Sequence, residues 1–176
     1  MDVAEAAAAL AEGGVVAFPT DTVYGLGVAP GGEARIYEIK GRPAKLPLIL
    51  MVIDAEQARG IVEIDDRARG FVERWWPGPL TLVLPAGDGT LGVRVPDHPL
   101  ALELLRAAGP LLTSSANRHG QPPALTADEA ARLPGLAGVV DGGRAPGGVP
   151  STVLDLSGPQ PRIVREGAIP AARLLA

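Results

Sequence analysis

One uninterrupted apolar segment, PLILMVI at residues 47–53, constrains the fold of this chain more than any other feature. It begins with a proline and is far shorter than the roughly 20 apolar residues that cross a membrane. A strand that is apolar on both of its sides is typical of a sheet with both faces covered. The segment therefore predicts a buried strand inside a layered α/β structure.

Helical and strand-like patterns alternate along the rest of the chain without an internal repeat. The Ala-rich stretch that starts at residue 2, for example, predicts a helix that stops at Gly13 and Gly14. Further helices are expected at 33–40, 65–76, 99–108 and 126–133, with a short helix at the end. Strands are expected at 15–18, 47–53, 80–85, 91–96, 110–115, 138–141, 151–156 and 162–166. This mixture indicates a single α/β domain over residues 1–176, with a twisted mixed sheet and flanking helices.

The composition excludes several classes of function. With 47% hydrophobic and 20% charged residues, the chain has the composition of a soluble globular protein. The absence of cysteine excludes disulfides, thiolate metal sites and cysteine nucleophiles. A formal charge of −4 argues against nonspecific nucleic-acid binding by the whole surface. Because Asp2 and Glu5 stand where a secretory signal would be basic, we expect a cytoplasmic protein with no membrane partner.

The chain uses some polar residue types very sparingly. Of its 16 basic residues, only Lys40 and Lys45 are lysines, and both lie in KGRPAKLP. Its single asparagine is Asn117, and SSAN together with Ser151 holds three of its four serines. Where the chain retains a residue type that it otherwise avoids, we expect a local requirement for it.

The segment KGRP at 40–43 offers two adjacent cations. Arg42 precedes Pro43, which disfavours helical geometry at Arg42. If the chain is extended from Lys40 onward, Lys40 and Arg42 point the same way and suit a polyphosphate. The alternative is a helix C-terminus whose cations interact favourably with the helix dipole.

The segment TSSAN at 113–117 offers neutral hydrogen-bonding groups after an apolar strand. If the strand stays extended, Thr113, Ser115 and Asn117 share one side. Together they can bind a carboxylate, a phosphate oxygen or a base edge. The alternative is an ordinary strand-end turn, in which Ser and Asn are favoured.

Several familiar kinds of site are not indicated. The chain has neither a P-loop motif nor a complete dinucleotide-binding fingerprint. His98 and His119 are too isolated to indicate a metal site, and Ser115 has no identifiable His–Asp partners. Arg94 and Arg165 each lie in a strand context, where an ordinary ion pair is the alternative to a binding role.

Six segments together resemble one known family. In chain order they are PTDTVYGLG, KGRP, RWWPGPLTLVL, VRVPDHP, SSAN and STVLDL. They resemble the YrdC-like threonylcarbamoyl-AMP synthases from about residue 3 to residue 167. The resemblance implies a twisted α/β sheet with a large concave, positively lined pocket. It implies condensation of L-threonine, bicarbonate and ATP to threonylcarbamoyl-AMP and pyrophosphate, with the product passed to a separate machinery that modifies the tRNA adenosine next to the anticodon.

The resemblance also implies roles for individual residues. The catalytic Lys-x-Arg and Ser-x-Asn signature is matched by Lys40, Arg42, Ser115 and Asn117. ATP binding would use these four together with Ser151 and Arg165, and L-threonine binding would use Thr20, Tyr24, Arg94 and Thr113. The Gly- and Pro-rich segment 141–150 would act as a lid. Mg²⁺ would arrive on the phosphates, because no carboxylate cluster indicates a dedicated metal site.

The sequence departs from the family pattern at two positions. Many members carry NPL and then a histidine at the end of the next strand, where this chain has Leu46 and Met51. Adenylation of a different small substrate is therefore one alternative function. The other is a non-catalytic module for double-stranded RNA with the same fold, although we expect at most weak RNA binding. The additional C-terminal domain of longer members is not expected.

Overall fold

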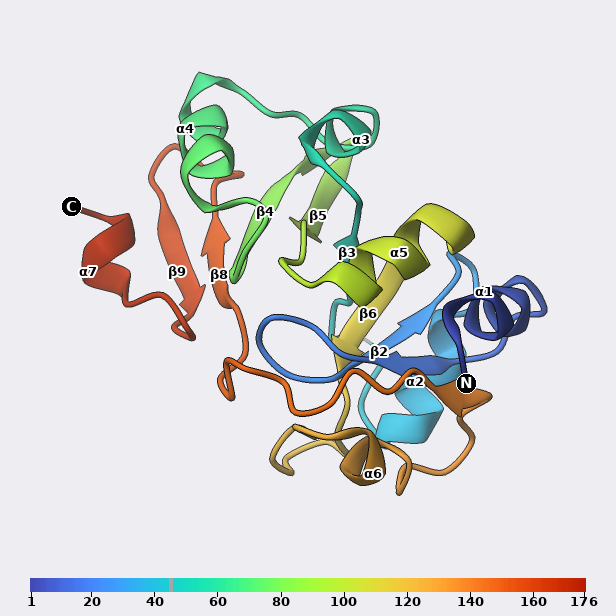
Figure 1. Ribbon diagram of the computed structural model, residues 1–176. Coiled ribbons are helices and arrows are strands. Elements are labelled where there is room, and N and C mark those ends of the chain that lie inside the picture. Colours follow the sequence, from blue (N-terminus) through green and yellow to red (C-terminus); the bar gives the residue numbers. More distant parts are fainter. Residues whose placement is uncertain (45) are drawn as a thin grey trace.

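A mixed sheet of nine strands forms the centre of the computed structural model, which describes residues 1–44 and 46–176 (Figure 1). Lys45 lies outside the described residues. The strands are β1 Val16–Phe18, β2 Gly25–Val28, β3 Ile49–Met51, β4 Leu80–Ala86, β5 Gly89–Arg94, β6 Leu111–Ser115, β7 Gly138–Val139, β8 Thr152–Asp155 and β9 Arg162–Arg165. Their order across the sheet is β7-β1-β2-β6-β3-β5-β4-β8-β9. The pairs β1–β7, β3–β5 and β4–β8 are parallel and the others antiparallel, which confirms the predicted mixed α/β sheet.

Helices cover both faces of the sheet in one half and only one face in the other, among the residues that the structure describes. They are α1 Val3–Ala11, α2 Glu33–Lys40, α3 Ala55–Arg59, α4 Asp66–Trp75, α5 Pro99–Ala108, α6 Ala127–Ala130 and α7 Ala171–Leu174. Around β1 and β2, α1 and α5 pack side by side on one face, and α2 and α6 lie on the other (Figure 1). Around β4 and β8, α3, α4 and α7 cover one face. The opposite face of these strands lines an apolar hollow of about 280 Å³ beside the site described below.

The helix predictions differ in how well they locate the ends. The predicted helices at 33–40 and 99–108 coincide with α2 and α5. Pro99 begins α5 and Gly109 follows its last residue, as the sequence signals indicate. The helix predicted at 126–133 is shorter, because α6 ends at Ala130. The short helix α3 and the strand β2 were not predicted.

The strand β2 depends on Gly27. A Cβ atom on Gly27 would lie 2.8 Å from Cε1 of Phe18, which is too close, whereas one on Gly25 would lie 3.7 Å from Cζ of the same ring, an ordinary contact. The ring of Phe18 on β1 therefore lies against the backbone of Gly27, where a side chain would clash. The intervening Leu26 points to the opposite face and is fully buried there.

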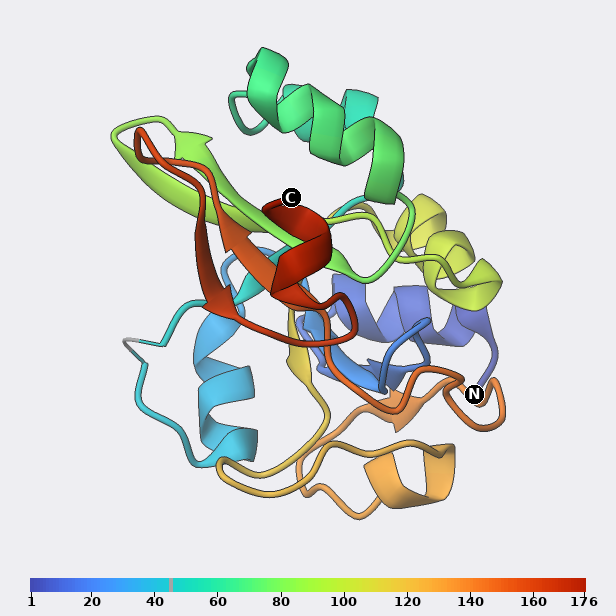
Figure 2. The same ribbon diagram turned by 90° about the vertical axis from the view of Figure 1, so that its left-hand side faces the viewer.

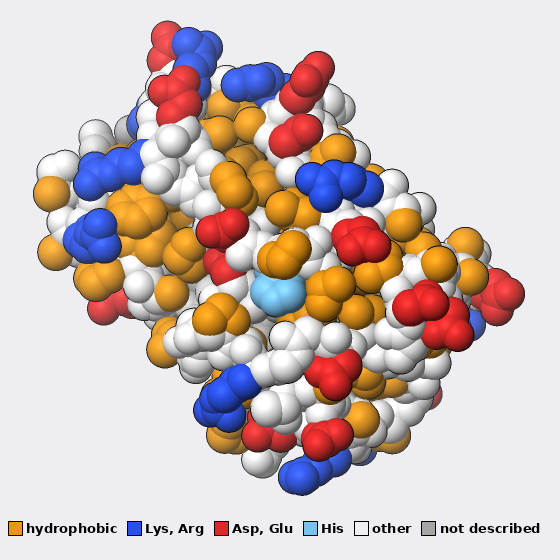
Figure 3. Space-filling model, viewed as in Figure 1, with side chains coloured by type: hydrophobic (Ala, Val, Ile, Leu, Met, Phe, Trp, Pro, Cys, Tyr) orange, Lys and Arg blue, Asp and Glu red, His pale blue; other side chains and the backbone are white. Residues whose placement is uncertain are grey.

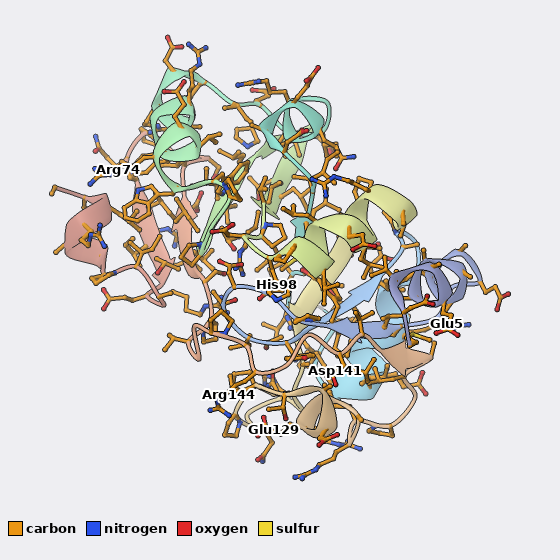
Figure 4. All side chains as sticks on the ribbon, in the orientation of Figure 1. Glu5, Arg74, His98, Glu129, Asp141 and Arg144 are labelled. Carbon is orange, nitrogen blue, oxygen red and sulfur yellow. The ribbon has the colours of Figure 1, made fainter. Side chains whose placement is uncertain are left out.

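The two tryptophans and two histidines lie where simple packing arguments place them. Trp75 and Trp76 pack against the core beneath α4, and Nε1 of Trp76 donates to the carbonyl of Leu80 at 2.7 Å. His98 immediately precedes α5 (Figure 4), and His119 lies in the loop after β6. Within the described part of the chain, none of the helices has the length and apolar character that crossing a membrane requires.

Candidate functional site

The candidate site is a cavity of about 160 Å³ at which the ends of β2, β3, β5, β6 and β9 meet. Eight of the ten predicted site residues line it: Thr20, Tyr24, Arg42, Arg94, Thr113, Ser115, Ser151 and Arg165. Lys40 and Asn117 do not line it, but each is hydrogen-bonded to Ser115, which does. Three lining residues are arginines, and none of the described lining residues is acidic. The cavity is therefore suited to an anionic ligand.

Arg94, the last residue of β5, is held from three directions. Its Nη2 donates to Oδ1 of Asp21 at 2.6 Å, and its Nη1 donates to Oγ1 of Thr22 at 3.1 Å. Its Nε donates to the carbonyl of Gly78 at 3.0 Å. The residue is only 3% exposed. Burial lowers the pKa of Arg94, and the carboxylate of Asp21 opposes this shift.

The turn between β1 and β2 is held together by its own hydroxyl groups. Oγ1 of Thr20 donates to the carbonyl of Val23 at 2.7 Å and accepts from the backbone N–H of Thr22 at 3.1 Å. Thr20 and Thr22 are each 1% exposed. The unusual density of hydroxyl groups after β1 therefore fixes the turn that carries Asp21 and Thr22 to Arg94.

Tyr24 connects this turn to the predicted lid at 141–150. Its hydroxyl donates to the carbonyl of Gly143 at 2.8 Å and accepts from the N–H of Gly142 at 3.2 Å. Further along the lid, the N–H of Gly148 donates to the carbonyl of Thr22 at 2.8 Å. Burial raises the pKa of Tyr24. The hydroxyl of Tyr24 is thus bonded to the predicted lid, and Tyr24 is one of the residues that line the cavity.

Lys40 is the last residue of α2, and it is 3% exposed. Its Nζ donates to the carbonyls of Ser115 and Asn117 and to Oδ1 of Asn117, the last two at 2.8 and 3.2 Å. Burial, with the nearby cation of Arg42, lowers the pKa of Lys40 to about 8. The ammonium therefore holds the chain at the end of β6.

The extended geometry considered for KGRP is wrong. Lys40 ends a helix, and Gly41 adopts the left-handed conformation with φ 60° and ψ 41°. The reversal at Gly41 still directs Arg42 to β6, where Nη1 donates to Oγ of Ser114 at 2.9 Å. Its Nη2 donates to the carbonyl of Pro47 at 3.2 Å, and its guanidinium lies 5.7 Å from the ring centre of Tyr37. Lys40 and Arg42 therefore meet at β6 through a helix C-terminus and not through strand alternation.

The extended geometry considered for TSSAN holds only as far as Ser115. Thr113 lines the cavity, and its Oγ1 donates to the carbonyl of Ile49 at 2.8 Å. After Ser115 the chain turns, and Oδ1 of Asn117 accepts from Oγ of Ser115 at 2.5 Å. The Nδ2 of Asn117 donates to the carbonyls of Arg118 and Gln121, at 2.8 and 2.9 Å. Asn117 therefore organises the loop after β6.

Ser151 and Arg165 line another part of the cavity, formed by the segment just before β8 and by the last residue of β9. The Nε and Nη2 atoms of Arg165 donate to the carbonyl of Ser151 at 3.2 and 2.8 Å. Oγ of Ser151 lies 2.9 Å from Oγ1 of Thr81. Burial lowers the pKa of Arg165. Met51, at the position where many family members carry histidine, also lines the cavity.

Sequence analysis did not identify three residues that shape the site. Asp21 and Thr22 hold Arg94, although 73 and 72 positions separate them from it in the chain. Ser114 accepts from Arg42. The rarity of serine in this chain was a usable signal for Ser114, whereas no local pattern links Asp21 to Arg94. Across residues 1–44 and 46–176, no group of three or more His, Asp or Glu side chains is arranged to hold a metal ion.

Comparisons with known proteins agree with this architecture. The family model Sua5_yciO_yrdC, described as "Telomere recombination", matches residues 8–167. The chain is 44% identical over 185 residues to the threonylcarbamoyl-AMP synthase of Bacillus subtilis, covering 95% of this chain and 54% of the relative. It is 36% identical to a putative threonylcarbamoyl-AMP synthase of Mycobacterium tuberculosis, covering 98% of this chain and 87% of the relative.

Two solved structures extend the comparison. P. abyssi Sua5 complexed with L-threonine has a TM-score of 0.93 at 38% identity, over 98% of this chain and 56% of that one. E. coli YciO has a TM-score of 0.83 at 28% identity, over 94% and 88% of the two chains. The chain spans about half the length of the B. subtilis and P. abyssi relatives. From the family match and these relatives, the chain belongs to the Sua5/YciO/YrdC family.

Proposed function

We propose that this chain is an L-threonylcarbamoyladenylate synthase, a nucleotidyltransferase that condenses L-threonine, bicarbonate and ATP to threonylcarbamoyl-AMP and pyrophosphate. One observation carries the proposal: three guanidinium groups meet at a hydroxyl-lined cavity, and among the described residues only that of Arg94 is paired with a carboxylate. The names of the relatives and the L-threonine complex of P. abyssi Sua5 support it.

The two substrates would occupy different sides of the cavity. The carboxylate of L-threonine would bind Arg94, and its polar groups would meet Thr20, Thr113 and the wall formed by Tyr24. The triphosphate would bind Arg42, Arg165, Ser115 and Ser151, while Lys40 and Asn117 would hold Ser115 through their hydrogen bonds. At about 160 Å³ the cavity is smaller than the roughly 300–1,000 Å³ of typical ligand pockets, so the nucleotide would extend beyond its enclosed part.

The proposed reaction needs no nucleophile from the protein. The amine of threonine and bicarbonate form a carbamate with loss of water. A carbamate oxygen then attacks the α-phosphorus, and the bond to the leaving pyrophosphate breaks. Such a transfer chiefly requires alignment of the reactants and stabilisation of the charge that develops on phosphate oxygens. Arginine side chains and oriented hydroxyl groups provide both.

Mg²⁺ would enter as part of the nucleotide substrate. The ion prefers oxygen ligands and retains several waters when phosphates bind it. The described lining of the cavity contains hydroxyl groups but no carboxylate, so the phosphate oxygens would supply the charged ligands. The product would pass in the cytoplasm to a separate transferase machinery that modifies tRNA.

Pyrophosphate release from ATP tests the proposal directly. We expect release that requires both L-threonine and bicarbonate and that stops when either is omitted. Release with other small amino acids in place of threonine would indicate a different substrate, for which Met51 is the first residue to test. Release that is indifferent to both co-substrates would contradict the proposed function.

A further inference from the structure

The guanidinium of Arg94 has more hydrogen-bond donors than the protein uses. An arginine carries five N–H groups. Among the described residues, three of them bond to Asp21, Thr22 and Gly78. One N–H on Nη1 and one on Nη2 therefore remain for a ligand. Arg94 lines the cavity, and a guanidinium can donate from two of its nitrogens to the two oxygens of one carboxylate.

Asp21 is itself held in place. Its Oδ1 accepts from Nη2 of Arg94 at 2.6 Å and from the backbone N–H of Asp97 at 3.0 Å. The turn that carries Asp21 is fixed by the hydroxyl of Thr20. The side chains of Asp21 and Arg94 are 12% and 4% exposed, so little solvent reaches the pair. A long arginine side chain needs such supports to keep one geometry.

The position of Asp21 and its charge have opposite consequences for an anionic ligand. Its negative charge repels a carboxylate in the cavity and cancels part of the attraction from Arg94. Its position, in contrast, aligns the two remaining N–H groups of Arg94. If charge dominated, removing that charge would tighten binding of a carboxylate. If position dominated, moving the oxygen would weaken binding even with the charge retained.

We propose that Asp21 is a positioning residue, which orients the Arg94 guanidinium so that its two remaining N–H groups bind the carboxylate of the amino-acid substrate. The inference rests on the proposed function for the identity of that substrate. In this role, the aspartate of the PTDT segment acts through Arg94 and does not itself contact the ligand.

Two variants separate position from charge. Asp21→Asn keeps an acceptor oxygen at nearly the same place and removes the charge, whereas Asp21→Glu keeps the charge and displaces the oxygen. We expect Asp21→Glu to weaken L-threonine binding about 10-fold and Asp21→Asn to change it by less than about 3-fold. The KM for ATP should change by less than about 2-fold in both variants, because the phosphate side does not contact Asp21.

The matched control is Asp155→Glu. Asp155 pairs with Arg162 at 2.9 Å on strands β8 and β9, and neither residue lines the cavity. This variant should leave the dissociation constant for L-threonine and both KM values unchanged.

A carboxylate-free analogue gives a readout that a purely structural role would not alter. L-Threonine amide lacks the carboxylate, so the wild-type protein should bind it much more weakly than L-threonine. Asp21→Glu should reduce this preference, because it misaligns the donors that recognise the carboxylate. Thermal unfolding of each variant shows whether the loss is local. A larger loss in Asp21→Asn than in Asp21→Glu, or an unchanged acid-to-amide preference in Asp21→Glu, would overturn the proposal.

Calorimetric titration with L-threonine keeps this test independent of turnover. If the wild-type protein binds L-threonine but releases no threonine-dependent pyrophosphate, the proposed function fails while the role of Asp21 is still measured. If turnover is observed and the two Asp21 variants bind L-threonine as the wild type does, only the positioning role fails.

Discussion

The two sides of the cavity hold their cations differently. On the amino-acid side, Arg94 is buried and paired with the carboxylate of Asp21 at 2.6 Å. On the phosphate side, Arg42 and Arg165 bond to hydroxyl and carbonyl oxygens. Neither has a carboxylate partner within the described part of the chain.

This difference matches two kinds of anion. A close ion pair cancels most of its own field, so the Arg94 side offers aligned donors with little net charge. Guanidinium groups without a counter-charge attract a more highly charged ligand and stabilise charge that develops on a leaving group. Under the proposed function, this difference would let one cavity bind a small zwitterion on the neutralised side and a polyphosphate on the other.

The largest effect on activity is expected from substitution of Lys40, which donates to the carbonyls of Ser115 and Asn117 at the end of β6. Lys40→Ala leaves the backbone carbonyl of Asn117 without its donor, at about 1–3 kcal/mol, and removes one of two donors to the carbonyl of Ser115 and to Oδ1 of Asn117. Adenylate formation should fall about 100-fold or more, as measured by pyrophosphate release. Lys40→Arg should also be impaired, because a planar guanidinium cannot replace a compact ammonium among these oxygens. Wild-type turnover in a folded Lys40→Ala protein would refute this role.

Removing one arginine from the phosphate side should weaken ATP binding more than L-threonine binding. Arg42→Ala and Arg165→Ala should each raise the KM for ATP about 10-fold, because each loses a charged hydrogen-bond donor. The KM for L-threonine should change by less than about 2-fold. Arg106→Ala, on the exposed side of α5 and outside the cavity lining, serves as the control. Equal losses for both substrates would mean that the two sides do not act separately.

Asn117 tests whether the loop after β6 belongs to the phosphate side. Its side chain joins Lys40, Ser115 and the carbonyls of Arg118 and Gln121. Asn117→Ala should weaken ATP binding about 5- to 10-fold, and L-threonine binding less, because Ser115 loses its partner. Separate titrations with the two ligands measure this. A matching loss for both would leave Asn117 as a general support of the cavity.

A smaller effect is expected from pH. The pKa of Lys40 is lowered from 10.5 to about 8, so rising pH removes its charge and weakens its hold on the end of β6. The kcat/KM for ATP should fall about 2-fold between pH 7 and the pKa of Lys40. This decrease should be absent in Lys40→Arg, because arginine keeps its charge over this pH range. The free energy of unfolding should change in the opposite direction and increase with pH. Between pH 8 and 10.5 the unfolded chain binds more protons than the folded one, so the stability of the wild type relative to Lys40→Met should rise with pH.

The smallest effect concerns RNA. On the face shown in Figure 3, arginines are scattered among acidic and hydrophobic side chains and form no continuous basic stripe. Binding by counterion release requires several clustered cations. At near-physiological salt we expect weak tRNA binding that ATP competes away, because Arg42 and Arg165 would serve both. Tight tRNA binding that is indifferent to ATP, without threonine-dependent pyrophosphate, would favour the RNA-binding alternative.

Sequence patterns within individual segments predicted some helices and strands of the fold and missed others. The helix α5 was predicted with both of its ends, because Pro99 and Gly109 act within the helix itself. The strand β2 was missed because its sequence GLGV has little strand propensity. It forms because β1 and β6 pair with it on both sides and because the ring of Phe18 requires a glycine at position 27. Elements that depend on neighbours cannot be recognised from their own residues.

The candidate site shows the same division. Rarity of lysine, asparagine and serine drew attention to Lys40, Asn117 and Ser115, and all three lie at the end of β6 or contact it. The helix C-terminus considered for KGRP is confirmed, because Lys40 ends α2 before a left-handed Gly41. The contacts of Lys40 with the chain after β6 were not predictable, because they depend on how that distant segment turns after Ser115. The pairing of Asp21 with Arg94 also could not be predicted from the sequence, because only folding brings these distant positions together.

The predicted lid at 141–150 offers one practical measurement. It runs as a loop from β7 to β8 (Figure 2) and is hydrogen-bonded to Tyr24 at Gly142 and Gly143 and to Thr22 at Gly148. Arg144, between these contacts, is exposed (Figure 4). The chain contains no cysteine, so Arg144→Cys would introduce a single thiol. A fluorophore attached there would report release of the segment in real time, with no background labelling. Stopped-flow traces with ATP and L-threonine added in either order would then show which ligand moves the segment first.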